Sequence, residues 1–122
     1  ITSLNGLHSL TSLQSVDASN NLIAALPMGN NIAGYQYALQ MLILANNRVG
    51  DLSALYTLPN LAYLDLTNNQ VSDVWVLANS GIFGSGDQVK LKGNLLDTDD
   101  CGAINSLRMM GVQVETDVAC TY

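Results

Sequence analysis

Two aspartates and one histidine are the first residues whose types suggest a catalytic site. Asp17 and Asp65 occupy equivalent positions two repeat units apart. If each unit supplies one strand of a parallel sheet, they lie roughly 10 Å apart, which would suit the two carboxylates of an inverting glycosidase. His8, the single histidine, has no nucleophile in a recognisable motif nearby and is expected at the surface. No other residue supports catalysis, so we do not expect an enzyme.

A cluster of acids at Asp97, Asp99 and Asp100 could suggest calcium binding. The spacing lacks the glycine and the distal glutamate of a calcium loop. Acidic residues are also favoured at the start of a helix, where they meet the positive end of its dipole. Helix capping is therefore the simpler interpretation, and we predict no metal site and no cofactor.

The two cysteines, Cys101 and Cys120, both lie near the C-terminal end. Zinc needs about four ligands and would find only these two thiols. A disulfide between them would constrain the unfolded chain by roughly 3 kcal/mol. An even cysteine count in such a segment points to an oxidising compartment, so we predict an extracellular, cell-surface or periplasmic location.

The elements that carry these residues follow a repeated pattern, L-x-x-L-x-L-x-x-N-x-V. Its clearest copies begin at Leu39 and Leu61, 22 residues apart. Alternating leucines predict a short strand with those side chains facing inward. An apolar residue at every third position follows, as in Val49, Leu52 and Leu55, and predicts tight helical turns along a return path. Stacked copies would align Val16, Leu42, Leu64 and Val89 in one buried row.

This repeat pattern resembles that of the leucine-rich repeat family, in particular the bacterial, SDS22-like class of 22-residue repeats found in internalins. The resemblance implies a right-handed α/β solenoid. Its parallel β-sheet would form the concave side, and short helical or 3-10 turns would form the convex side. It also implies that the concave sheet binds a protein or, less often, a glycan. The asparagine of the motif is expected to form a structural ladder that satisfies backbone groups where each strand ends. Its members are Asn21, Asn47, Asn69 and Asn94.

We predict a single leucine-rich repeat domain over residues 1–122. It comprises a partial repeat (1–12), repeats at 13–38, 39–60 and 61–85, a degenerate last repeat (86–96) and a C-terminal cap (97–122). The cap is expected to contain a helix ending at Gly111 and a short strand at 112–116. The first repeat is longer by an insertion containing Tyr35 and Tyr37, which we interpret either as a surface contact or as cover for the neighbouring core.

The residues between the inward-facing positions would form the concave face. Met41, Ile43 and Tyr63 make an exposed apolar and aromatic patch with Asp65 and Lys90 at its rim, a composition typical of protein-binding hot spots. The alternative is that variable strand positions simply tolerate such residues. The predicted ligand-binding residues are Asp17, Met41, Ile43, Tyr63, Asp65, Gln88 and Lys90.

Composition limits the classes of partner. Four basic residues against ten acidic ones, with a net charge of -6, argue against nucleic-acid binding. No apolar run approaches the roughly 20 residues that cross a bilayer, so membrane insertion is not expected. The leading hypothesis is a secreted or cell-surface bacterial module that binds another protein. The alternative is a structural terminal fragment whose open N-terminal end stacks on further repeats or on another copy.

Overall fold

The computed structural model describes residues 14–26 and 39–120. The partial repeat, His8 and the insertion with Tyr35 and Tyr37 therefore lie outside the described residues. The elements in chain order are β1 (Ser15–Asp17), β2 (Met41–Ile43), η2 (Ser53–Thr57), β3 (Tyr63–Asp65), α1 (Trp75–Asn79), β4 (Gln88–Lys90), η3 (Thr98–Asp100), α2 (Cys101–Met109) and β5 (Gln113–Glu115).

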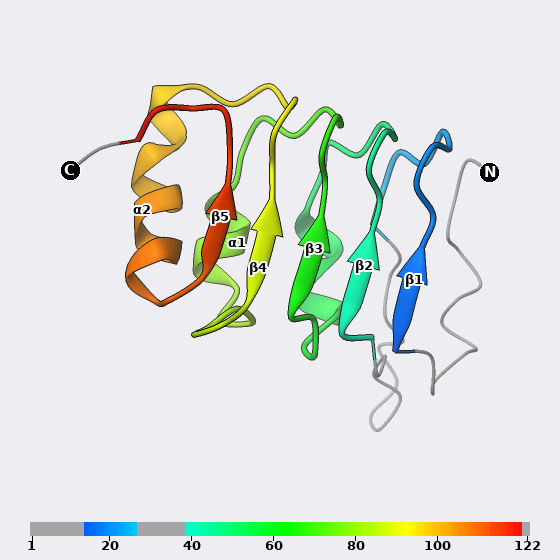
Figure 1. Cartoon of the computed structure of the whole chain (residues 1–122), viewed down its shortest axis with the longest axis horizontal. Coiled ribbons are helices and arrows are strands. Elements are labelled where there is room, and N and C mark those ends of the chain that lie inside the picture. The colour runs from blue at the N-terminus through cyan, green and yellow to red at the C-terminus, as the bar shows by residue number, and fades with distance from the viewer. Residues whose placement is uncertain (1–13, 27–38, 121–122) are drawn as a thin grey trace.

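One parallel sheet holds all five strands in the order of the sequence, β1-β2-β3-β4-β5 (Figure 1). Its register follows the repeat, since Leu42 pairs with Val16 on one side and with Leu64 on the other. Val89 continues the same row. The predicted leucine-rich repeat solenoid is thereby confirmed.

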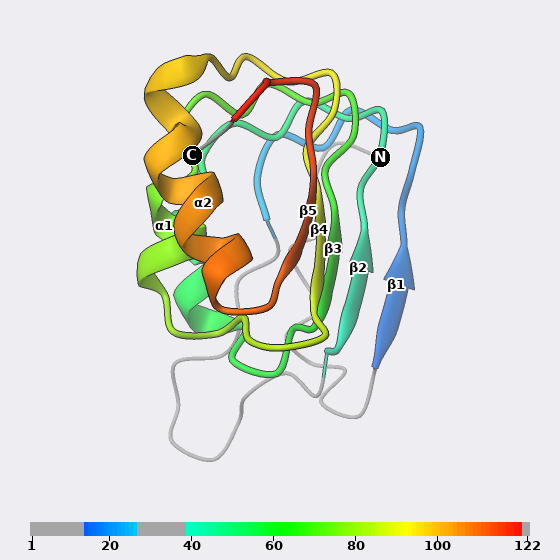
Figure 2. The same ribbon diagram turned by 60° about the vertical axis from the view of Figure 1, so that its left-hand side comes forward.

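The molecule has two layers, with the sheet on one side and η2, α1 and α2 on the other (Figure 2). Inward-facing strand residues such as Leu42 and Leu64 are fully buried between the layers. Val49, Leu52 and Leu55 of a return path are buried against them, as the three-residue spacing predicts. The opposite face of the sheet carries no helix within the described part of the chain, and we call it the outward face.

The cap contributes more to the sheet than the sequence indicated. The expected strand at 112–116 is β5, and it pairs in parallel with β4, placing Val114 beside Val89. The predicted buried row Val16, Leu42, Leu64 and Val89 accounts for four strands, and β5 brings the sheet of the described residues to five. The outward face is therefore one strand wider, and it gains Gln113 and Glu115.

The acids at 97–100 cap η3, the 3-10 helix that leads directly into α2. Asp97 accepts a hydrogen bond from the backbone N–H of Asp99 at 2.9 Å, and Asp100 accepts one from the N–H of Asp97 at 3.1 Å. This reciprocal capping box satisfies backbone donors that a helix start leaves unpaired. Gly111 follows the helix with a φ of 87°, a left-handed conformation that glycine adopts without steric cost.

No helix in the described residues is long and apolar enough to cross a membrane.

Candidate binding surface

The outward face consists of two rows of side chains that run across the strands. The strand register places all seven predicted ligand-binding residues in these rows. β5 adds a further residue to each row. The first row is Ser15, Met41, Tyr63, Gln88 and Gln113, and the second is Asp17, Ile43, Asp65, Lys90 and Glu115.

β2 presents an apolar strip on this face, between β1 and β3. Met41 is 37% exposed, and Ile43 and Ala45 are partly exposed beside it. At the level of Ile43, the neighbouring strands carry a carboxylate on each side, Asp17 on β1 and Asp65 on β3. The structure thus brings the apolar and acidic residues together as one surface.

Both carboxylates are held in a defined orientation by a hydroxyl two residues later. Asp17 Oδ1 accepts hydrogen bonds from the backbone N–H of Ser19 at 3.1 Å and from its Oγ at 2.7 Å. Asp65 Oδ1 accepts from the N–H of Thr67 at 3.0 Å and from its Oγ1 at 2.6 Å. The Ser19 hydroxyl and then its N–H lower the pKa of Asp17 from its usual value, because both stabilise the charged form.

The other end of the outward face carries cations paired with acids and an aromatic ring. Lys90 Nζ lies 5.5 Å from the centre of the Tyr63 ring. The Tyr63 side chain raises the pKa of Lys90, and the carboxylates of Asp65 and Glu115 add to the effect. Lys92 forms an ion pair with Glu115, with 3.3 Å between Nζ and Oε1. Lys90, Lys92 and Glu115 together carry one net positive charge.

A small hollow of about 190 Å³ lies over β4 and β5. Its lining comes from Gln88, Lys90, Gln113 and Glu115, together with Val89 and Val114. Gln113 and Glu115 were not among the predicted ligand residues. The sequence contained only one signal for them, the short alternating stretch at 112–116, and gave no indication that it joins the sheet.

The carboxylate pair does not resemble a glycosidase site. Asp17 and Asp65 lie on either side of Ile43, and neither lines the hollow over β4 and β5. A general acid of an inverting enzyme needs a raised pKa, whereas the pKa of Asp17 is lowered. The geometry therefore favours fixed surface charges at these two positions.

The motif asparagines bond to backbone groups, and Asn47, Asn69 and Asn94 do so across neighbouring repeats. Asn47 Oδ1 accepts from the N–H of Ile23 at 3.0 Å, and its Nδ2 donates to the carbonyl of Ala18 at 3.0 Å. Asn94 makes equivalent contacts with Val71 and Leu66. Asn21 donates to the carbonyls of Ala18 and Ser19. These side chains bond to backbone groups where each strand ends.

A second row of asparagines was not predicted. Asn46 Nδ2 donates to Asn20 Oδ1, and Asn68 Nδ2 donates to Asn46 Oδ1, each at 2.9 Å. All three residues have a positive φ, near 60°, which asparagine tolerates better than most residues. Gly93 occupies the next position with a φ of 74°. The sequence carries a signal for this second row in its Asn-Asn pairs at 20–21, 46–47 and 68–69, but the predicted ladder contains only the second member of each pair and Asn94.

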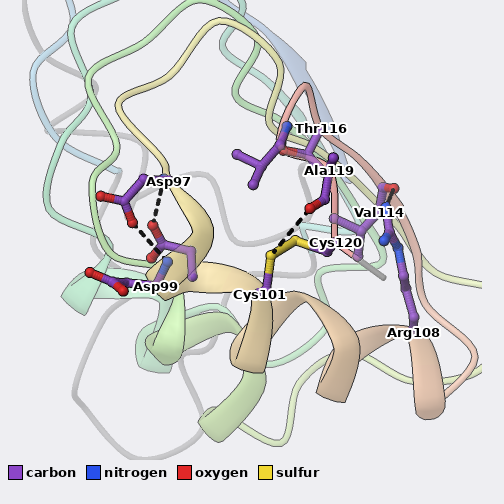
Figure 3. The surroundings of a disulfide bond; sticks show 10 residues. Asp97, Asp99, Cys101, Arg108, Val114, Thr116, Ala119 and Cys120 are labelled. Atoms are coloured by element: carbon purple, nitrogen blue, oxygen red, sulfur yellow. Dashed lines mark hydrogen bonds between the residues drawn. A yellow bond between two sulfur atoms is a disulfide. The ribbon is translucent and has the colours of Figure 1, made fainter. Parts of the chain in front are cut away.

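A disulfide joins Cys101 of α2 to Cys120 near the end of the chain, as predicted, with 5.2 Å between the Cα atoms (Figure 3). Beside it, Arg108 donates a hydrogen bond to the carbonyl of Val114 on β5 at 3.1 Å (Figure 3).

In the part of the chain that the structure describes, no group of three or more acidic, histidine or cysteine side chains gathers as a metal site.

Comparisons with known proteins agree with this architecture. Residues 38–79 match the family described as Leucine Rich repeats (2 copies). The structure is similar to an internalin (inlF) from Listeria monocytogenes, with a TM-score of 0.74, 25% identity, and coverage of 100% of this chain and 34% of that chain. It also shares its fold with a chain of the Drosophila melanogaster SNF/U2A' complex, with a TM-score of 0.53, 21% identity, and coverage of 77% of this chain and 58% of that one. Comparison with curated protein sequences finds no match.

The five-stranded parallel sheet of the described residues, the repeat register and these similarities define a leucine-rich repeat solenoid. Its repeats are similar to those of the internalin. The chain spans about a third of the internalin and less than two thirds of the second protein.

Proposed function

We propose that this chain is a protein-binding module whose outward face receives the partner. Leucine-rich repeats and the similar structures support a binding role, since one neighbour is part of a complex by its description. The observation that carries the proposal is the apolar strip on β2, with Met41 37% exposed between two carboxylate-bearing strands. Parallel strands usually have large apolar side chains covered on both faces.

The composition of the face suits a protein partner better than a glycan, the alternative ligand. Exposed apolar side chains next to an aromatic residue, with charges at the rim, are typical of the centre of a protein interface. Tyr63 supplies the aromatic ring, and Lys90 lies over it. The partner would cover Met41, Ile43 and Tyr63 and leave Lys90 and Asp65 at the edge.

The setting we propose is the outside of a bacterial cell, in a secreted or cell-surface protein. The disulfide between Cys101 and Cys120 supports this, because such bonds persist in oxidising compartments. The similarity to an internalin supports it as well, although the chain covers only 34% of that protein.

Site-specific cross-linking tests the proposal. A photoreactive amino acid replaces Met41 on the outward face or, as a control, Tyr56, which is 56% exposed on η2 in the opposite layer. Each variant is illuminated with extracellular protein fractions from the protein's source. We expect a heterologous cross-linked product from position 41 that disappears when Ile43→Ala and Tyr63→Ala are added. Equal yields from both positions would contradict the proposal.

The structural alternative makes a different prediction. A self-stacking fragment would give cross-links between copies of this chain, and Ile43→Ala with Tyr63→Ala would leave its assembly intact. Sedimentation then decides between the two, because a monomer at the concentrations used excludes obligate stacking. The N-terminal end on which that alternative depends lies outside the described residues.

A further inference from the structure

The outward face is divided by charge into two halves. Over β1, β2 and β3 its two charged residues are Asp17 and Asp65, and no described residue of the two rows on these strands is a cation. Over β4 and β5, Lys90 and Lys92 outnumber Glu115, with which Lys92 forms an ion pair. A partner that lies on the first half therefore meets Asp17 and Asp65 with an apolar strip between them, and Lys90, which lies over Tyr63, marks the border beside Asp65.

We infer that the face over β1–β3 binds a basic protein segment in which an apolar side chain is flanked by two arginine or lysine side chains. This inference rests on the proposed function and adds the chemistry of the partner. The apolar side chain would lie on Ile43 and Met41, and the two cations would pair with Asp17 and Asp65.

The two carboxylates are preorganised for this role. In each, one oxygen accepts both bonds from the following Ser19 or Thr67, and the second oxygen makes no hydrogen bond to the described residues. A fixed side chain loses less conformational entropy on binding than a free one. Hydrogen bonds between a guanidinium or ammonium group and a carboxylate are also stronger than those between neutral groups. Each Asp thus offers an oriented acceptor to a cation.

The spacing fits an extended segment. Asp17 and Asp65 lie one strand to either side of Ile43, so they are roughly 10 Å apart. In an extended peptide, residues i, i+2 and i+4 point to one side over roughly 13 Å. Long basic side chains can close the remaining difference. The net charge of -6 adds a long-range attraction for a basic partner.

A pair of short peptides tests the inference by NMR. The probe is acetyl-Arg-Ala-Leu-Ala-Arg-amide, and the control is acetyl-Glu-Ala-Leu-Ala-Glu-amide. The reporters are the methyl groups of Met41 and Ile43, with buried Ile104 of α2 as the internal reference. We expect millimolar arginine peptide to shift the Met41 and Ile43 signals and leave Ile104 unchanged, and added salt to reduce the shifts. The glutamate peptide should produce none.

Matched variants assign the effect to the two carboxylates. Asp17→Asn with Asp65→Asn should reduce the apparent affinity about 2- to 30-fold, the range for the loss of two exposed ion pairs. Asp51→Asn with Asp73→Asn makes the same charge change at exposed positions that precede η2 and α1, and it should leave the affinity nearly unchanged.

Three results would overturn the inference. These are the absence of any shift at millimolar peptide, an equal or larger shift with the glutamate peptide, and equal losses in both double variants. A fourth result, from the cross-linking experiment, separates the inference from the proposed function. If the cross-link from position 41 persists in the Asp17→Asn, Asp65→Asn variant with unchanged yield, the face binds a protein and only the basic character of the partner is wrong. Equal cross-link yields from positions 41 and 56 would contradict the proposed function itself.

Discussion

Asn69 bridges two repeats through its side-chain amide. Its Oδ1 accepts a hydrogen bond from the backbone N–H of Val49 at 2.9 Å, and its Nδ2 donates to the carbonyl of Leu44 at 2.9 Å. The side chain is only 6% exposed, so water cannot readily replace it. We propose that this residue and its equivalents hold each strand end to the preceding repeat.

Replacing Asn69 with leucine should therefore destabilise the fold. The change leaves a buried N–H and a buried carbonyl without this partner, at a cost of about 1–3 kcal/mol. Urea unfolding followed by circular dichroism measures the loss. Gln70→Leu, at the exposed neighbouring position, is the control. An unchanged midpoint for Asn69→Leu would show that the amide is dispensable.

Gly93→Ala should be destabilising for a different reason. Gly93 has a φ of 74°, and a Cβ at this position would overlap Asn68 Oδ1. The left-handed conformation alone costs a non-glycine residue about 1–2 kcal/mol. Thermal unfolding should show this loss, whereas Gly84→Ala, where an added Cβ meets nothing within 4 Å, should change stability little. Similar melting temperatures for the two variants would contradict the described geometry.

Reduction of the disulfide should weaken the cap. Cys101 and Cys120 are separated by 19 residues, and the constraint on the unfolded chain is about 3 kcal/mol. Unfolding with and without dithiothreitol measures this contribution. The variant with Cys101→Ser and Cys120→Ser should match the reduced wild type and be insensitive to dithiothreitol. If the reductant lowers its stability too, the effect does not come from this bond.

Ser19→Ala should raise the pKa of Asp17 toward its ordinary value, because the Ser19 hydroxyl is the largest cause of the lowered pKa. A carbon-detected NMR titration of the Asp17 carboxyl measures the change, with Ser15→Ala as the control. A lowered folded pKa stabilises the fold above the unfolded pKa and loses that contribution as pH falls through the folded value. Wild type and Ser19→Ala should therefore converge in stability at the acid end. A lack of convergence would mean that the hydroxyl acts through something other than the carboxylate.

Arg108→Leu should loosen the last strand of the described sheet. The Arg108 guanidinium donates to the carbonyl of Val114 on β5, the outermost strand in the strand order. Loss of this hydrogen bond should cost about 1 kcal/mol. Hydrogen exchange should become faster for the β5 amides that bond to β4. Met109→Ala, at a position that is 78% exposed on the same helix, should leave exchange unchanged. Equal rates in both variants would mean that the guanidinium does not support β5.

The repeat pattern was sufficient to predict the buried row, which consists of Val16, Leu42, Leu64 and Val89. It also predicted the face of the sheet on which Met41, Ile43 and Tyr63 lie. The fixed period aligns equivalent residues of neighbouring strands, so the register follows from the sequence. β5 was different. Its residues lack the leucine pattern, and its pairing with β4 depends on how α2 packs and returns the chain to the sheet.

Sequence alone therefore determined the solenoid, its buried rows and the side chains that point outward, because each depends on a local hydrophobic pattern repeated at a fixed spacing. Only the tertiary structure decided which outward side chains meet. Lys90 lies over Tyr63, Lys92 pairs with Glu115, and Asn68 donates to Asn46. Such contacts join residues of different strands or turns, and they depend on side-chain orientation and backbone φ, which no linear pattern specifies.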